Sequence, residues 1–190
     1  MYKLLRSLFL LVGLFWSTDS LTAQQQKYRA ENAKVTLITL VEGIAIQGLN
    51  HNATSILDAK TGQVLFLVPA QSFKFRSALV QKYFNYPGFS YSKKYPYIKF
   101  KGYIVDYANL NLQTNQNQLV TIEGKLTVRG VTKPMKATGT LARVNKTQLA
   151  GTAQLIVPDV YAFRIGRQKD TAFLRGTKLT IKVEADYRKE

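Results

Sequence analysis

Much of the chain consists of short segments in which apolar and polar residues alternate. The alternation is clearest in four segments: 97–107, 119–129, 149–157 and 178–187. In 119–129 the apolar positions are Val120, Ile122, Leu126 and Val128, and polar residues stand between them. A period of two places the apolar side chains of a strand on one face. These segments are therefore predicted to be β-strands with one buried and one hydrated face.

Further strands are predicted earlier in the chain, at 34–41, 43–49, 52–58 and 63–69. The last of these is apolar on both faces, as a more deeply covered strand would be. Turn-forming residues separate the strands at 49–52, 60–62, 115–117 and 144–146. Short strands at even spacing indicate an antiparallel barrel or sandwich. A closed barrel of about eight strands has an interior that side chains fill or that holds one ligand.

Two segments do not fit a strand. In 76–86, apolar residues recur at helical spacing, Ser77 is a suitable N-cap, and Pro87-Gly88 ends the helix. In 166–176, Asp170 is placed to cap a helical turn that ends at Gly176. We therefore expect one or two short helices beside the strands.

The first residues resemble a secretory signal. Lys3 and Arg6 precede an apolar run over 8–16, which is too short to span a bilayer, and Ala23 offers a small residue for cleavage. We expect residues 1–23 to be a signal peptide and 24–190 to form one domain, which is periplasmic or secreted. A membrane anchor is the alternative for the first segment.

Charge and composition narrow the functional classes. The net charge is +16, which suits contact with anionic surfaces such as a membrane, and also simple solubility. Export argues against a nucleic-acid partner. The chain has no cysteine, so disulfides, thiol catalysis and cysteine-bound metals are excluded. The composition does not determine the oligomeric state.

Candidate catalytic groups are few. His51 is the only histidine and lies in an asparagine-rich turn, and Asp106 interrupts an apolar strand face. Asp106 points into the barrel, sits at its rim, or pairs with a nearby base. No convergent set of acids, bases or metal ligands is present. We therefore expect no enzyme activity, no catalytic residue, no metal and no cofactor.

The richest segment is 73–102, in which ten of thirty residues are aromatic, interleaved with Lys and Arg. Large rings in a connection line a core, a pocket or an interface. We predict that an apolar pocket is lined by Phe73, Phe75, Leu79, Phe84, Phe89, Tyr95, Phe100 and Tyr107. We predict Lys93, Lys94 and Arg129 at its rim, where they would orient an anionic head group. Ordinary core packing is the alternative for each ring.

Two motifs carry a resemblance to a known family. One runs from Phe73-Lys74-Phe75 through 79–85 to Lys94-Tyr95-Pro96 and Phe100-Lys101-Gly102, and the other is 124–133, GKLTVRGVTK. A weaker match lies at 158–165. Over about residues 34–187 the chain resembles the YceI-like family of exported bacterial proteins. Its basic Ser92-Lys93-Lys94 stands where the family often has acidic residues.

The resemblance implies a fold and a ligand class. It implies an all-β, eight-stranded antiparallel lipocalin-like barrel with a helix, enclosing a pocket for isoprenoid or other lipid-like chains. We therefore expect a non-enzymatic carrier of a long apolar molecule, with peripheral contact to an anionic membrane. The alternatives are a filled barrel that acts through its surface in interaction or stress protection, an enzyme, and an outer-membrane barrel.

Overall fold

Nine strands in one sheet make up most of the part of the chain that the structure describes. A computed structural model describes residues 26–190, so the predicted signal peptide over 1–23 lies outside the described residues. The strands are β1 (Lys27–Val41), β2 (Ile44–Asp58), β3 (Gln63–Pro69), β4 (Lys74–Phe75), β5 (Tyr97–Ile104), β6 (Gln118–Val128), β7 (Val131–Asn145), β8 (Gln148–Val157) and β9 (Leu179–Lys189). The helices are α1 (Ala78–Asn85) and the 3₁₀ helices η1 (Ala70–Ser72), η2 (Tyr107–Asn109), η3 (Val160–Phe163) and η4 (Lys169–Leu174).

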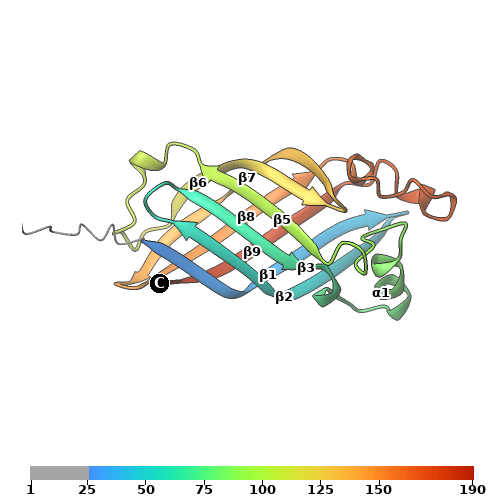
Figure 1. Cartoon of the computed structure of the whole chain (residues 1–190), viewed down its shortest axis with the longest axis horizontal. Helices are drawn as coiled ribbons and strands as arrows, with labels where there is room; N and C mark the ends of the chain where they lie inside the picture. The colour runs from blue at the N-terminus through green and yellow to red at the C-terminus, as the bar shows by residue number, and fades with distance from the viewer. Residues whose placement is uncertain (1–25) are drawn as a thin grey trace, which may run out of the picture.

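The sheet closes into a barrel. Its order is β1-β9-β8-β7-β6-β5-β3-β2-β4, every pairing is antiparallel, and β1 also pairs with β2. The two-residue strand β4 adds to β2 at the edge of the barrel and leaves eight long strands in the closed ring. Figure 1 shows these strands crossing the molecule obliquely. The predicted antiparallel barrel of eight strands is confirmed.

The alternating segments place their apolar residues inside, as predicted. Val120, Ile122 and Leu126 of β6 are buried, and so are Leu155 and Val157 of β8. The prediction that β3 is covered on both faces is wrong, because Leu67 is 39% exposed on its outer face. A closed barrel is a single layer of sheet, so outward side chains meet solvent unless a loop covers them.

The predicted turn at 49–52 is also wrong. β2 runs unbroken from Ile44 to Asp58, so His51 lies on a strand with an exposed side chain. The register with β1 shifts twice here: β1 carries an extra residue between Ala30 and Ala33, next to Asn32 with its φ of 60°, and β2 carries one between Asn50 and Ala53. Asn50 is fully buried, donates through Nδ2 to the Pro69 carbonyl at 2.8 Å, and accepts from the Asn52 backbone N–H at 2.8 Å. These bonds satisfy the buried side-chain amide of Asn50 beside the extra residue of β2.

The helix over 76–86 is confirmed as α1. The Ser77 hydroxyl accepts a hydrogen bond from the Val80 backbone N–H, and the helix ends at Asn85, two residues before Pro87. The second predicted turn is the 3₁₀ helix η4. Its N-cap is Gln168, so Asp170 lies in the first turn and the capping role predicted for it is wrong.

The connections gather at two ends of the barrel. We call the end that carries α1, η3, η4 and the tips of the β1–β2 and β6–β7 hairpins the mouth end (Figure 1). The far end carries the β2–β3 and β7–β8 turns and the η2 connection over 105–117. Long connections between antiparallel neighbours therefore occur mainly at the mouth end, where they are free to cover the interior.

Candidate functional site

Within residues 26–190, three mainly apolar cavities follow one another through the barrel. The mouth cavity, of about 150 Å³, is lined by residues of α1, η4, β1 and β2. The middle cavity, of about 70 Å³, lies within the sheet, and a far cavity of about 30 Å³ follows it. The mouth and middle cavities share Leu37. The middle and far cavities share Phe66, Ile122, Ala153 and Val183.

Four phenylalanine rings separate the mouth cavity from the middle cavity. We call Phe73, Phe75, Phe84 and Phe89 the aromatic cluster. The ring of Phe84 lies 5.3 Å from that of Phe73, 4.8 Å from that of Phe75 and 5.1 Å from that of Phe89. Phe73 is fully buried and lines the middle cavity, whereas the other three line the mouth cavity. The Phe73–Phe84 contact therefore connects the linings of the two cavities, and Leu37 lines both of them.

Two paired glycines support the wall of the middle cavity. Gly102 of β5 pairs with Gly124 of β6. A Cβ atom at Gly124 would lie 2.4 Å from the Lys101 carbonyl oxygen and 2.8 Å from the ring of Phe100. Because both positions lack a side chain, the ring of Phe100 lies close against the backbone instead of crossing the cavity. The segments 100–102 and 124–126 therefore form one continuous part of the cavity wall.

Six of the predicted pocket residues line a cavity. Phe73 and Phe100 line the middle cavity, and the mouth cavity is lined by Phe75, Leu79, Phe84 and Phe89.

The other two predicted pocket residues, Tyr95 and Tyr107, lie outside these cavities. Tyr95 packs against Gly130 and has its ring 5.9 Å from that of Tyr91. Tyr107 lies at the far end, where its hydroxyl donates to the Ala59 carbonyl at 2.6 Å and burial raises its pKa to about 12.

The predicted rim residues behave differently from one another. Lys93 and Lys94 are exposed at the mouth end, and the Lys94 ammonium lies 5.7 Å from the centroid of the Tyr95 ring. Arg129 instead holds connections together. Its Nη2 donates to the Pro87 carbonyl at 2.7 Å, and its Nη1 donates to the carbonyls of Gly88 and Arg164. Burial lowers the pKa of the Arg129 guanidinium.

Arg129 thus ties the connection after α1 to the connection after η3. We expect Arg129→Met to lower the free energy of unfolding by about 2 kcal/mol, because hydrogen bonds from a charged donor are lost. Amide hydrogen exchange should accelerate over 86–90 and 164–176. Urea unfolding and hydrogen-exchange mass spectrometry measure the two effects. Lys93→Met, at an exposed position, serves as control and should change stability by no more than about 0.5 kcal/mol. Equal effects of the two substitutions would contradict the role of Arg129.

Much of the lining escaped prediction from the sequence. Val35, Leu155, Ile181 and Val183 line the middle cavity, and none of them is among the predicted pocket residues. The alternating pattern predicted a buried face for the last three only. The contribution of η4 to the mouth cavity, through Thr171, Phe173 and Leu174, had no local signal. It depends on Gly88, where a Cβ would lie 2.4 Å from the Thr171 methyl carbon.

The cavities offer little chemistry beyond apolar contact. Within residues 26–190 no three His, Cys, Asp or Glu side chains gather in a way that could hold a metal ion. Asp106 is exposed at the far end, with φ of 52°. At the far cavity, the Tyr187 and Ser55 hydroxyls share a hydrogen bond of 2.8 Å, so this buried polar pair is internally satisfied. Among the described helices, none is long and apolar enough to cross a membrane.

A closed eight-stranded antiparallel barrel with an apolar interior, and with a helix over one end, defines the lipocalin-like class of small barrels. The family model for the YceI-like domain matches residues 27–186. The chain therefore belongs to the YceI-like family, and the resemblance found in its two central motifs is confirmed. No curated protein matches the chain.

Solved structures share the fold at low sequence identity. A polyisoprenoid binding domain from Saccharophagus degradans, implicated in plant cell wall breakdown, aligns with a TM-score of 0.71 and 10% identity over 87% of this chain and 99% of that one. Burkholderia cenocepacia BcnA aligns at 0.65 and 18% identity, over 81% and 95%. The Campylobacter jejuni YCEI protein aligns at 0.54 and 17% identity, over 73% and 83%.

Proposed function

We propose that this protein is an exported, non-enzymatic binding protein that holds one long apolar molecule, of isoprenoid or acyl type, inside its barrel. The observation that carries the proposal is the succession of three apolar cavities from the mouth end into the sheet. Membership of the YceI-like family and the likeness to a polyisoprenoid binding domain support it. The proposed location is the periplasm or the exterior, with peripheral contact to an anionic membrane.

Apolar burial is the source of affinity in this proposal. Each buried methylene contributes about 0.8 kcal/mol, whereas an exposed lysine paired with an anionic head group contributes about 0–1 kcal/mol. A chain that buries several methylenes therefore gains more from the cavities than from Lys93 or Lys94. The exposed lysines would orient the head group, and the barrel would select for length and flexibility.

The available space places a condition on the ligand. Pockets for small molecules typically have volumes of about 300–1,000 Å³, and the mouth cavity alone has about 150 Å³. A long chain therefore needs the Phe73–Phe84 contact to open, so that the mouth and middle cavities join. Small, divided cavities also favour a second candidate, a filled barrel that acts through its surface without a ligand.

Occluding the middle cavity distinguishes the two candidates. Ala137 is buried in the wall of this cavity, so Ala137→Leu places three additional carbon atoms in a space of about 70 Å³. We expect at least a tenfold loss of affinity for a fluorescent isoprenoid probe, equivalent to about 1.4 kcal/mol, measured by titration. The exposed Ala108 provides the matched control, and Ala108→Leu should leave affinity unchanged.

Native mass spectrometry of protein purified without detergent supplies the second readout. An apolar molecule should accompany the unmodified protein and be depleted in Ala137→Leu. Repeated lipid-free preparations that take up no probe would favour the filled barrel. Turnover of a substrate that disappears on replacing Asp106 or His51 would instead support an enzyme.

A further inference from the structure

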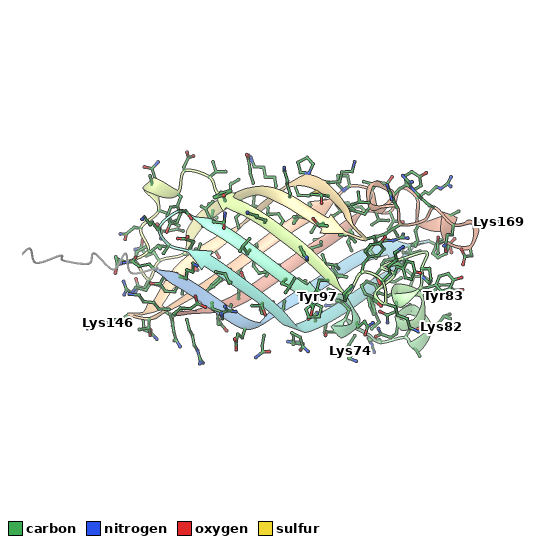
Figure 2. All side chains as sticks on the ribbon, in the orientation of Figure 1. Lys74, Lys82, Tyr83, Tyr97, Lys146 and Lys169 are labelled. Carbon is green, nitrogen blue, oxygen red and sulfur yellow. The ribbon has the colours of Figure 1, made fainter. Side chains whose placement is uncertain are left out.

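Positive charge is concentrated at one end of the barrel. Ten exposed basic residues lie at the mouth end: Lys74, Arg76, Lys82, Lys93, Lys94, Arg164, Arg167, Lys169, Arg175 and Lys178. Three acidic residues accompany them: Glu42, Asp159 and Asp170. Figure 2 shows Lys74, Lys82 and Lys169 at this end and Lys146 at the opposite one.

These mouth-end cations are not neutralised by neighbours. The ion pairs found among residues 26–190 are Arg29–Glu190, Lys34–Glu184 and Lys136–Glu123, and none includes one of the ten. The far end is more balanced: its basic residues are Lys27, Arg29, Lys60, Arg143, Lys146, Arg188 and Lys189, and its acidic residues are Glu31, Asp58, Asp106, Asp186 and Glu190. The electrostatic potential of the protein is therefore most positive at the mouth end, where it attracts anions.

Exposed apolar side chains stand at the same end. Leu40 and Ile44 flank the tip of the β1–β2 hairpin and are 65% and 67% exposed. Leu79 of α1 is 63% exposed, Phe173 of η4 is 48% exposed and Tyr83 of α1 is 44% exposed. The last three also line the mouth cavity. Single exposed apolar residues are common on protein surfaces, but here three separate elements present them around the opening of one apolar cavity.

We infer that the mouth end of the barrel docks on an anionic lipid bilayer, with the hairpin tip and α1 in the interfacial layer and the ten cations facing lipid head groups. This inference rests on the proposed function for its purpose, since it names the surface from which an apolar ligand would enter the mouth cavity. Unpaired cations around protruding apolar side chains match a bilayer interface, where charge attracts and apolar groups insert. The ligand would then pass from lipid to protein without crossing water.

Sedimentation with vesicles tests the charge requirement. The purified protein should bind vesicles of phosphatidylglycerol and phosphatidylcholine in equal parts at least tenfold more tightly than vesicles of phosphatidylcholine alone. Raising the salt concentration from about 0.15 M to about 0.5 M should weaken this binding, because the Debye length shortens. The double charge reversal Lys82→Glu with Lys169→Glu should reduce binding at least tenfold, since each Lys or Arg near an anionic surface contributes about fivefold.

Matched variants at the far end separate a docking surface from a general effect of charge. The reversal Lys60→Glu with Lys146→Glu makes the same change in net charge and should reduce binding much less. For the apolar component, Leu40→Ser with Ile44→Ser should reduce binding severalfold. Leu119→Ser with Val144→Ser, at far-end positions 88% and 59% exposed, should leave it unchanged. Equal losses from mouth-end and far-end variants would overturn the inference.

Two further readouts keep the inference distinct from the proposed function. Uptake of the isoprenoid probe in the absence of vesicles tests the barrel alone, and Lys82→Glu with Lys169→Glu should leave uptake unchanged. Absent or charge-independent vesicle binding with normal uptake would overturn the docking surface only. Vesicle binding without uptake would overturn the proposed function only. Light scattering that reveals a dimer disrupted by Leu40→Ser with Ile44→Ser, without vesicle binding, would assign this surface to a second copy and also overturn the inference.

Discussion

Phe73→Ala is expected to lower the free energy of unfolding by about 3–5 kcal/mol, the typical cost of removing a fully buried ring. Phe73 has no exposed surface, and its ring packs edge-on against Phe84. Its removal should also join the mouth and middle cavities, because its ring lines the middle cavity and contacts Phe84, which lines the mouth cavity. Urea unfolding measures the first effect, and faster uptake of an isoprenoid probe in stopped-flow mixing measures the second.

Two substitutions serve as controls for Phe73. Phe173→Ala removes the same ring from a position that is 48% exposed and should cost no more than about 1 kcal/mol. Phe73→Leu keeps most of the apolar volume, so it should cost less than Phe73→Ala while still loosening the contact with Phe84. A loss of stability below about 1 kcal/mol for Phe73→Ala, with unchanged uptake, would show that the ring neither supports the core nor separates the cavities.

Alkaline pH is expected to destabilise the protein through Tyr187. Burial raises the pKa of Tyr187 to about 12, above the ordinary value of 10.0, although the hydrogen bond with Ser55 opposes this shift. The folded state therefore holds the phenolic proton more tightly than the unfolded state. The stabilising effect is complete below the unfolded pKa and is lost as pH rises through the folded pKa. Two pKa units correspond to about 3 kcal/mol, lost between about pH 10 and pH 12.

Tyr187→Phe isolates this contribution. At neutral pH it should lower stability by about 1–2 kcal/mol, because the buried Ser55 hydroxyl loses its partner. Above about pH 10 the variant should lose stability less steeply than the unmodified protein. Urea midpoints measured across this range test both statements, and Tyr97→Phe, at a 46% exposed position, should leave the alkaline slope unchanged. Tyr107, whose pKa burial also raises to about 12, acts in the same direction in both proteins. Parallel slopes for Tyr187→Phe and the unmodified protein would contradict the role of Tyr187.

The strands were predictable because their information is local. A two-residue period in β5, β6, β8 and β9 reports directly on which face is buried, and Ser77 with Pro87 marks the ends of α1. The turn predicted at 49–52, within β2, is wrong because the contacts that decide the structure there are not local. Asn50 and Asn52 favour turns in isolation, but β2 pairs with β1 on both sides of them, and the Asn50 side chain bonds to the carbonyl of Pro69, nineteen residues away.

The candidate site was predictable only in part. The aromatic cluster follows from the density of rings over 73–89, where helix and loop keep neighbouring residues close. Tyr107 shows where prediction from ring density fails. The eight residues of β5 carry the chain about 26 Å, from the mouth end to the far end, so Tyr107 lies far from the aromatic cluster. Arg129 illustrates a second limit of local patterns. Its guanidinium donates to the carbonyls of Pro87 and Arg164, which are 42 and 35 residues away in the sequence. Nothing near Arg129 in the chain indicates that its guanidinium is already engaged.

Periodicity and turn chemistry thus determined that this chain forms short antiparallel strands with one apolar face, and the family motifs determined how those strands close. The closing of the sheet into a barrel decided which distant residues meet. Rolling the sheet into a ring brought β1 against β9, placed the connections at two ends, and left three apolar spaces between side chains that are distant in sequence. Cavities and the grouping of charges at one end are properties of non-local packing, and local residue patterns carry no measure of either.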